Sequence, residues 1–139
     1  MLEGLSGSEH EDIVVTRRAT SGLRAIIAVH STRLGPSLGG ARFYPYGDEA
    51  LALHDVLRLS RAMTAKAALA GLAHGGGKAV IIGDPNLMKT PSLLRDFAAT
   101  VDRLEGRYIT AEDVGTTQHD MDLIHETTPF VAGTSTSRG

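Results

Sequence analysis

The stretch GLAHGGGKAVIIGD, residues 71–84, decides how the rest of the chain is interpreted. Its second half, residues 78–84, is a compact apolar run that ends at a glycine, and this pattern predicts a buried β-strand. Three glycines at 75–77 stand directly before Lys78, although glycine is costly to order. We expect Lys78 at the start of this strand, and ligands of α/β sheets collect at strand ends. The stretch therefore predicts both a central strand and a chemical site.

Hydrophobic periodicity and turn residues predict alternating strands and helices after an initial hairpin. The Ser21-Gly22 turn joins the two β-rich runs of the hairpin, and apolar spacings of three and four predict a long helix before Gly71. The expected elements are strands over 12–20, 23–32, 40–43, 78–84, 107–113 and 129–133, and helices over 49–70, 91–105 and 118–126. This order predicts an α/β fold: a single domain with a mixed, largely parallel sheet flanked by helices, beginning with a β-hairpin.

The composition excludes several classes of protein. The chain has 139 residues, 42% hydrophobic and 22% charged, with a net charge of −2, which is typical of one globular domain without a nucleic-acid footprint. Aromatic residues make up only 4%, which argues against a stacking surface for single strands. Cysteine is absent, which excludes disulfides and thiolate sites and fits a cytoplasmic location. The apolar runs are far shorter than the ~20 residues that cross a bilayer, so we expect no membrane partner.

Four local features carry the candidate chemistry. They are Leu38-Gly39-Gly40 with the following Arg42, Lys66 in an alanine-rich helix end, Lys78 after the glycines, and Asp113 just past a predicted strand. Lys66 could also extend to solvent, as helix lysines commonly do, so the local pattern leaves its role open. Lys78 and Asp113 carry opposite charges at the ends of two predicted strands. We therefore expect them to meet at one edge of the sheet.

The glycine–lysine motif does not fit a phosphate-binding loop. Leu72 stands where that motif requires glycine, Ala79 stands where it requires serine or threonine, and the segment enters a strand rather than a helix. No G-x-G-x-x-G dinucleotide motif occurs in the chain. The histidines show no H-E-x-x-H or comparable pairing, so we expect no metal site.

The motifs LGPSLGGAR (34–42), MTAKAALAGLAHGGGKAVIIGDP (63–85) and GRYITAEDVGTTQHDMDLIHETTPFVAG (106–133) together resemble one known domain. It is the N-terminal substrate and oligomerisation domain of the glutamate/leucine/phenylalanine/valine dehydrogenases, and the resemblance covers residues 12–134. Ala111-Glu112-Asp113 resembles the leucine/valine branch. The resemblance implies reversible NAD(P)-dependent oxidative deamination of an L-amino acid to a 2-oxo acid and ammonia. It also implies a homo-oligomer, because this family assembles through this domain.

The same resemblance implies roles for individual residues. Lys78 is the general acid/base that acts on the water adding to the iminium, and Asp113 assists proton transfer at the amino group. Lys66 binds the substrate α-carboxylate. The remaining implied residues are the substrate-binding Leu38, Gly39, Gly40 and Met63 and the cofactor-binding Arg42.

Leu38 indicates which side chain the substrate carries. Glutamate enzymes resemble this chain but have a lysine at this place, and that lysine pairs with the substrate γ-carboxylate. A buried carboxylate facing Leu38 would have no partner. We therefore expect an apolar substrate, namely leucine, valine, isoleucine or phenylalanine, with an acidic amino acid as the alternative.

The expected organisation is a flexible tail over 1–11, the dehydrogenase N-terminal domain over 12–134 and a truncated linker over 135–139. We expect NAD or NADP to be bound mainly by a nucleotide-binding domain that is missing from this chain, because the chain contains no dinucleotide motif. The chain alone would then be inactive, since it holds no hydride acceptor. A non-catalytic oligomerisation module is the alternative from another class, with the hairpin over 12–32 as its contact edge.

Overall fold

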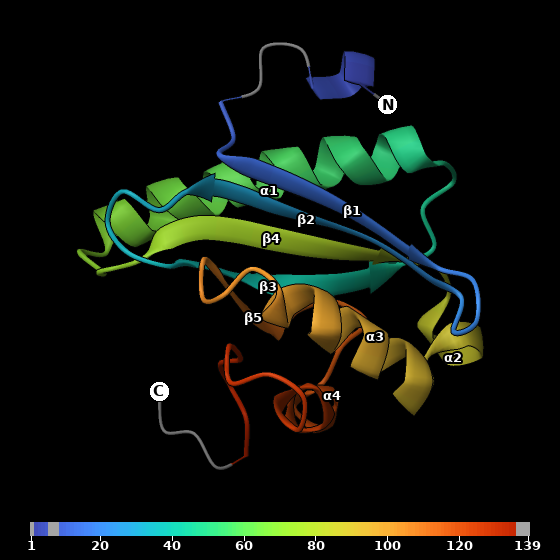
Figure 1. Cartoon of the computed structure of the whole chain (residues 1–139). Helices are drawn as coiled ribbons and strands as arrows, with labels where there is room; N and C mark the ends of the chain where they lie inside the picture. The colour runs from blue at the N-terminus through green and yellow to red at the C-terminus, as the bar shows by residue number, and fades with distance from the viewer. Residues whose placement is uncertain (1, 6–8, 136–139) are drawn as a thin grey trace.

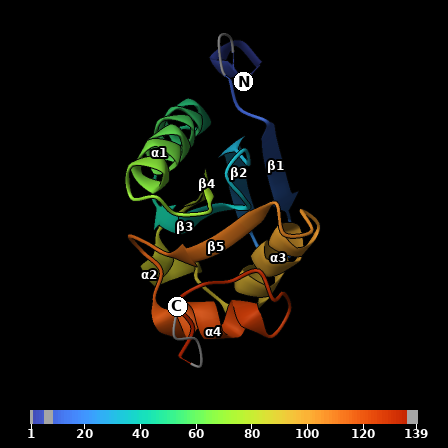
Figure 2. The same cartoon turned by 90° about the vertical axis from the view of Figure 1, so that its left-hand side faces the viewer.

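A five-stranded sheet separates α1 from α3 and α4 in the computed structural model, which describes residues 2–5 and 9–135 (Figure 1 and Figure 2). The strands are β1 (Asp12–Arg18), β2 (Leu23–Ser31), β3 (Ser37–Tyr44), β4 (Gly75–Ile82) and β5 (Tyr108–Glu112). The helices are the 3-10 helix η1 (Leu2–Leu5) and α1 (Glu49–Leu69), α2 (Pro85–Met88), α3 (Pro91–Asp102) and α4 (Gln118–His125). Residues 136–139 of the predicted linker lie outside the described residues.

The strand order is β1-β2-β4-β3-β5, which makes β4 the central strand. β1 pairs with β2 and β2 with β4 in the antiparallel sense, whereas β3 is parallel to both β4 and β5. The crossover from β3 to β4 through α1 runs in the opposite direction along the sheet from the crossover from β4 to β5 through α3. Right-handed crossovers therefore put the two helices on opposite faces. The predicted α/β fold with a mixed sheet and an opening hairpin is confirmed.

The start of β4 differs from the prediction. The strand begins at Gly75, so the glycines belong to it, and Lys78 lies within the strand instead of at its start. The reason is steric: a Cβ atom on Gly75 would lie 1.7 Å from the Ser31 carbonyl oxygen, and one on Gly76 would lie 2.1 Å from the Thr64 backbone nitrogen of α1. The glycines let β2 and α1 approach the strand closely. They do not form an open loop beneath a ligand.

Other elements also differ from the predictions: β1 and α3 end earlier than expected, at Arg18 and Asp102. β3 is longer than expected and begins at Ser37. The strand predicted over 129–133 is reduced to a single bridge between Thr110 and Val131, because the segment meets β5 only there. α2 was not predicted; it is one short turn that Asp84 caps by accepting from the Asn86 N–H at 2.9 Å.

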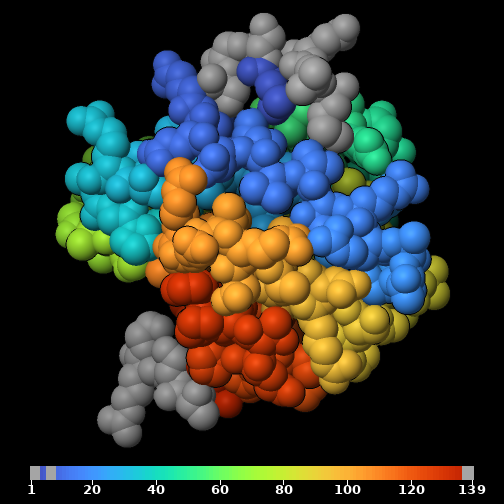
Figure 3. Space-filling view, in the orientation of Figure 1, coloured from blue at the N-terminus to red at the C-terminus, as the bar shows by residue number. Residues whose placement is uncertain are grey.

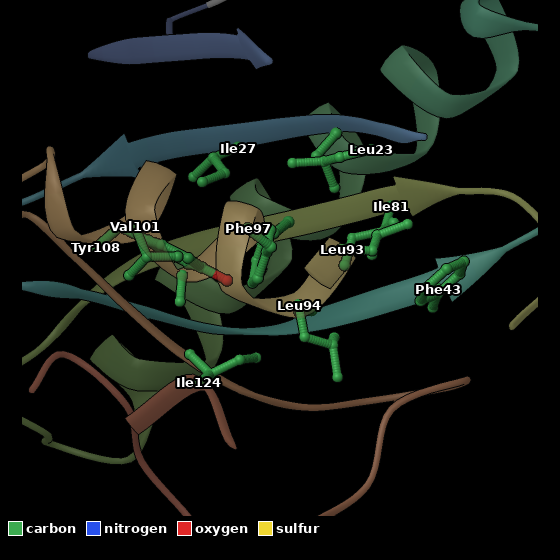
Figure 4. Close-up of a cluster of buried hydrophobic side chains, with 14 of the residues drawn as sticks. Leu23, Ile27, Phe43, Ile81, Leu93, Leu94, Phe97, Val101, Tyr108 and Ile124 are labelled. Atoms are coloured by element: carbon green, nitrogen blue, oxygen red, sulfur yellow. The ribbon is translucent and has the colours of Figure 1, made fainter. Parts of the chain in front are cut away.

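Two apolar clusters hold the layers together. The larger cluster lies between the sheet and α3 and α4, with Phe97 at its centre and Ile81, Phe43 and Tyr108 contributed by the strands (Figure 4). In the space-filling view, the orange and red surface of α3, β5 and α4 forms one continuous layer below the blue β1 (Figure 3). The smaller cluster lies between the sheet and α1, and its buried members are Ile26, Ala28, Ala52, Leu53, Val56, Leu57, Val80 and Ile82.

Alternation along the central strands fixes which side chains face α1. Ala79 and Ile81 of β4 belong to the cluster on the α3 side, whereas Val80 and Ile82 belong to the cluster on the α1 side. Side chains alternate between the two faces of a strand, so Lys78 projects toward α1. The same argument places Arg42 of β3 on that face, because its neighbours Ala41 and Phe43 lie on the other.

Candidate functional site

Lys78 and Asp113, which the sequence predicted would meet, form an ion pair between Lys78 Nζ and Asp113 Oδ2. The side chains are 9% and 15% exposed, respectively. Asp113 follows the last residue of β5 and lies over Gly40, where an added Cβ would be 2.8 Å from the Asp113 Cβ. A buried ammonium requires a counter-charge. The ion pair therefore explains how the central strand tolerates a lysine.

Arg42 joins this pair from β3. Its Nη2 atom lies 3.5 Å from Asp113 Oδ1, and the backbone N–H of Val114 donates to the same oxygen at 2.7 Å. Burial alone would raise the pKa of the Asp113 carboxyl. The hydrogen bonds from Lys78 and Val114 and the charges of Lys78 and Arg42 nevertheless hold this pKa below its ordinary value. Asp113 is therefore a carboxylate at neutral pH.

The turn after β5 is fixed to β3 by a threonine. The Thr116 hydroxyl donates to the Ala41 carbonyl at 2.8 Å and accepts from the Asp113 backbone N–H at 2.9 Å. Gly115 has φ +81°, and an added Cβ there would lie 2.0 Å from the Phe43 carbonyl oxygen. Only glycine fits this turn, so the backbone itself restricts where Asp113 can lie.

Lys66 and Met63 lie on the flank of α1 that faces this site. An α-helix has 3.6 residues per turn, so Asp55, Met63 and Lys66, at i, i+8 and i+11, share one flank. Arg42 Nη1 lies 3.4 Å from Asp55 Oδ2, which orients this flank toward β3. Met63 is half-buried and Lys66 is exposed in the last turn of α1. No ion pair within the described residues engages Lys66.

Leu38 and Gly40 lie on the site face of β3, whereas Gly39, predicted to bind substrate with them, faces the α3 side together with Ala41 and Phe43. Leu38 is half-buried and pairs with Gly76 of β4. An added Cβ on Gly39 would lie 1.6 Å from the Gly77 carbonyl oxygen, and the Gly39 carbonyl accepts from the buried Tyr108 hydroxyl at 2.7 Å. The protein's own packing therefore already requires glycine at positions 39 and 40.

Sequence reasoning missed Asp55, Tyr46 and Arg58. The Tyr46 hydroxyl donates to Asp55 Oδ2, and Arg58 Nη2 lies 2.6 Å from Asp55 Oδ1. Burial and the hydrogen bond to Asp55 raise the pKa of the Tyr46 hydroxyl. The i, i+3 spacing of Asp55 and Arg58 was a visible signal for their pairing. No local pattern signals the contact of Asp55 with Arg42, because this contact depends on how α1 packs on the sheet.

These side chains form one alternating series of charges, which we call the charge network: Lys78, Asp113, Arg42, Asp55 and Arg58. Its outer end opens into a cavity of about 490 Å³. The cavity lining includes Arg42, Tyr44, Tyr46, His54, Asp55, Arg58 and Val114. The network thus connects a buried lysine to a surface that solvent reaches.

Neither a metal-ligand cluster nor a glycine-rich phosphate loop is found in the described part of the chain. Within residues 2–5 and 9–135, no group of three His, Cys, Asp or Glu side chains could hold a metal ion. The glycine triplet lies inside β4 and does not precede a helix, so it cannot cradle a phosphate. No helix in the described part of the chain is long and apolar enough to cross a membrane.

Comparison with known proteins gives consistent matches. Residues 10–130 match the model of the Glu/Leu/Phe/Val dehydrogenase dimerisation domain. The chain is 53% identical over 131 residues to leucine dehydrogenase of Bacillus subtilis and 54% identical over 130 residues to valine dehydrogenase of Streptomyces virginiae. Each alignment covers 94% of this chain and 36% of the relative, so the chain spans little more than a third of their length. The crystal structure of L-tryptophan dehydrogenase from Nostoc punctiforme matches with a TM-score of 0.88 and 45% identity, covering 94% of this chain and 39% of that one.

Proposed function

The chain belongs to the Glu/Leu/Phe/Val dehydrogenase family, and from this premise we propose that it is the substrate-binding and proton-transfer half of an NAD(P)-dependent dehydrogenase of branched-chain L-amino acids. The reaction is oxidative deamination to a 2-oxo acid and ammonia. The observation that carries the proposal is the buried Lys78–Asp113 ion pair on the α1 face of the sheet. A shielded acid–base pair of this kind suits proton transfer, which requires a positioned side chain.

Each residue has one part in the proposed mechanism. Lys66 binds the α-carboxylate, because its ammonium is exposed and lies on the flank of α1 nearest the charge network. Lys78, in its uncharged amine form, takes a proton from the water that adds to the iminium carbon of the substrate, and it thereby becomes the ammonium that pairs with Asp113. Asp113 accepts or returns a proton at the amino group. Arg42 keeps the Asp113 carboxylate compensated while Lys78 changes its charge.

The proposed substrate carries an apolar side chain. Leu38 is a half-buried apolar side chain on the site face of β3, and it offers no charge to a γ-carboxylate. Leucine and valine are the substrates in the names of the two curated relatives. We therefore propose leucine, valine or isoleucine ahead of an aromatic or an acidic amino acid.

The nicotinamide cofactor supplies the hydride acceptor in this reaction, and we propose that residues beyond these 139 bind most of it. The absence of a G-x-G-x-x-G motif from the sequence supports this assignment. On this basis the chain alone is inactive. The cofactor contact predicted for Arg42 stays a prediction, and the two carboxylates that Arg42 already faces favour a role within the site instead. The cytoplasmic location stays a prediction as well.

A non-catalytic oligomerisation module is the second candidate, favoured by the description of the matching domain as a dimerisation domain. The two proposals are compatible, because one domain can both assemble and bind substrate. Sizing of the purified chain tests assembly, and titration with leucine or its 2-oxo acid tests substrate binding. A chain that oligomerises but binds neither ligand would favour the module alone.

Replacing Lys78 by methionine in the complete enzyme tests the catalytic proposal. Methionine keeps a long side chain but cannot transfer a proton, so leucine oxidation should fall by about 10²- to 10⁴-fold. Lys89→Met is the matched control, since Lys89 also pairs with a buried carboxylate, Asp120, at 2.7 Å. The control should keep near-normal kcat if it folds, as judged by circular dichroism. Near-normal kcat in a folded Lys78→Met enzyme would refute the proposal.

A further inference from the structure

We propose that Asp55 and Arg42 form a positioning unit that holds the Asp113 carboxylate in the orientation that meets Lys78. The two residues touch neither substrate nor cofactor in this proposal. They act through Asp113. The kinetic consequences rest on the function proposed above, whereas the structural consequences for Asp113 do not.

The geometry of the guanidinium supports this role. Arg42 directs Nη1 to Asp55 Oδ2 at 3.4 Å and Nη2 to Asp113 Oδ1 at 3.5 Å, so one planar group faces two carboxylates. The three residues come from α1, β3 and the turn after β5. A guanidinium presents its donors in a rigid fork, whereas an ammonium is a point charge. Arg42 therefore links the position of α1 to the position of Asp113.

Asp55 is itself firmly held as a carboxylate. It accepts from the Tyr46 hydroxyl and from Arg58, and it faces Arg42. Burial alone would raise the pKa of the Asp55 carboxyl, but the hydrogen bonds from Tyr46 and Arg58 and the two arginine charges hold it below its ordinary value. Asp55 therefore competes with Asp113 for the charge of Arg42 at neutral pH.

The Arg42–Asp55 contact is not needed to attach α1 to the sheet, because apolar packing already does so. Ala52, Leu53 and Val56 of α1 are at most 3% exposed against Ile26 and Val80 of the sheet. Exposed ion pairs contribute little to stability, typically about 0–1 kcal/mol. The Arg42, Asp55 and Asp113 side chains are instead only 23%, 16% and 15% exposed. Because these three side chains are partly buried, water screens their charges less, and Arg42 can hold the Asp113 carboxylate in place.

The proposal predicts that replacing Arg42 and replacing Asp55 shift the pKa of Asp113 in opposite directions. Without Arg42, the Asp113 carboxylate loses one of its two cationic neighbours, so its pKa should rise. When Asp55 loses its charge, Asp113 is the one carboxylate of the charge network that Arg42 still faces. The pKa of Asp113 should therefore fall further. The other titratable groups that act on Asp113 are Lys78 of β4 and the hydroxyls of Tyr46 and Tyr108, and all three are unchanged in both variants.

The test is a pH titration of the Asp113 side-chain carboxyl by carbon-13 NMR in Arg42→Gln and Asp55→Asn, with Asp113→Asn to assign the resonance. The expected midpoints move up in Arg42→Gln and down in Asp55→Asn. Arg61→Gln is the matched control, because Arg61 lies on the opposite flank of α1, near His10 and His30, and should leave the midpoint unchanged. Shifts of the same sign, or none, would overturn the proposal.

Variants that keep the charge but change the shape of the side chain distinguish a positioning role from a purely electrostatic one. Asp55→Glu keeps the charge and should restore the normal midpoint, whereas Arg42→Lys keeps the charge but cannot face both carboxylates. In the complete enzyme, Arg42→Lys should therefore lower kcat by about 10- to 100-fold with little change in KM for leucine. Equal kcat in Arg42→Lys and the unaltered enzyme would contradict positioning. If Lys78→Met kept its activity, the proposed function would fail, and the carboxyl titration would still decide the present proposal.

Discussion

The Lys78 side chain is 9% exposed in the central strand, and an isolated ammonium there would be costly to bury. Asp113 compensates this charge. Asp113 has two further partners besides Lys78, the Val114 N–H and Arg42. The Asp113 carboxylate would therefore stay compensated in a proton transfer that removed the charge of Lys78. This arrangement is what the proton transfer proposed for Lys78 requires.

Substrate preference belongs to the residue scale as well, and Leu38→Lys tests it. An ammonium at this position would provide the counter-charge that a γ-carboxylate needs, so glutamate turnover should rise relative to leucine turnover. In the complete enzyme, we expect the ratio of kcat/KM for glutamate to kcat/KM for leucine to increase by about tenfold or more. This is the size of effect expected when a buried charge gains a hydrogen-bonding partner.

Leu34→Lys is the control for this substitution, because Leu34 is 52% exposed in the turn before β3. It adds the same charge outside the site face of β3 and should leave the ratio unchanged. An unchanged ratio in Leu38→Lys as well would count against the assignment of Leu38 to the substrate side chain.

At the scale of elements, the starts of α1, α3 and α4 were predicted well because their capping signals are local. Asp48, Thr90 and Thr117 each cap a helix by accepting from a backbone N–H, and the capping box between Thr117 and Asp120 is present. The start of β4 could not be predicted in the same way. Its glycines are explained by atoms of Ser31, Thr64 and Ser37 that are distant in sequence. The Arg42–Asp55 contact is missed for the same reason, since it joins two elements.

Close packing of α1 on β4 predicts a large effect of Gly76→Ala. The added Cβ would lie 2.1 Å from the Thr64 backbone nitrogen and 2.6 Å from the Ser60 carbonyl oxygen, so the helix backbone itself must move. We expect the free energy of unfolding to fall by about 3 kcal/mol, at the upper end of overpacking effects. Urea unfolding followed by circular dichroism measures this change.

Gly71→Ala is the matched control for this steric argument. Gly71 follows α1 with φ +69°, and an added Cβ meets nothing within 4 Å. The cost there is conformational only, about 1 kcal/mol. If the two alanine variants were equally stable, close approach of α1 would not be the reason for glycine at position 76.

At the scale of the whole molecule, two histidines connect the segment before β1 to α1. His10 Nε2 lies 2.8 Å from Ser60 Oγ and 3.1 Å from the Leu57 carbonyl oxygen, and His30 Nδ1 lies 2.8 Å from Thr64 Oγ1. The two rings are 4.8 Å apart, edge to face. The N-terminal segment, β2 and α1 are therefore joined through two histidine side chains.

This junction predicts a loss of stability on mild acidification. Burial and the neighbouring His30 lower the pKa of His10, and burial and Arg61 lower the pKa of His30, while Glu9 and Glu11 act on His30 in the opposite sense. The unfolded chain therefore binds these protons more strongly than the folded chain does. The free energy of unfolding should be constant above the ordinary histidine pKa of 6.5 and fall as the pH drops below it.

A separate loss should follow at lower pH, because Asp55 and Asp113 have lowered pKa values and their contribution disappears only as the pH falls below about 4. Guanidinium unfolding at intervals from pH 8 to pH 3 should therefore show two declines. The double variant His10→Gln/His30→Gln should flatten the first decline and keep the second, which serves as the internal control. A first decline of unchanged slope in the double variant would assign the sensitivity to other groups and remove the histidine junction as its cause.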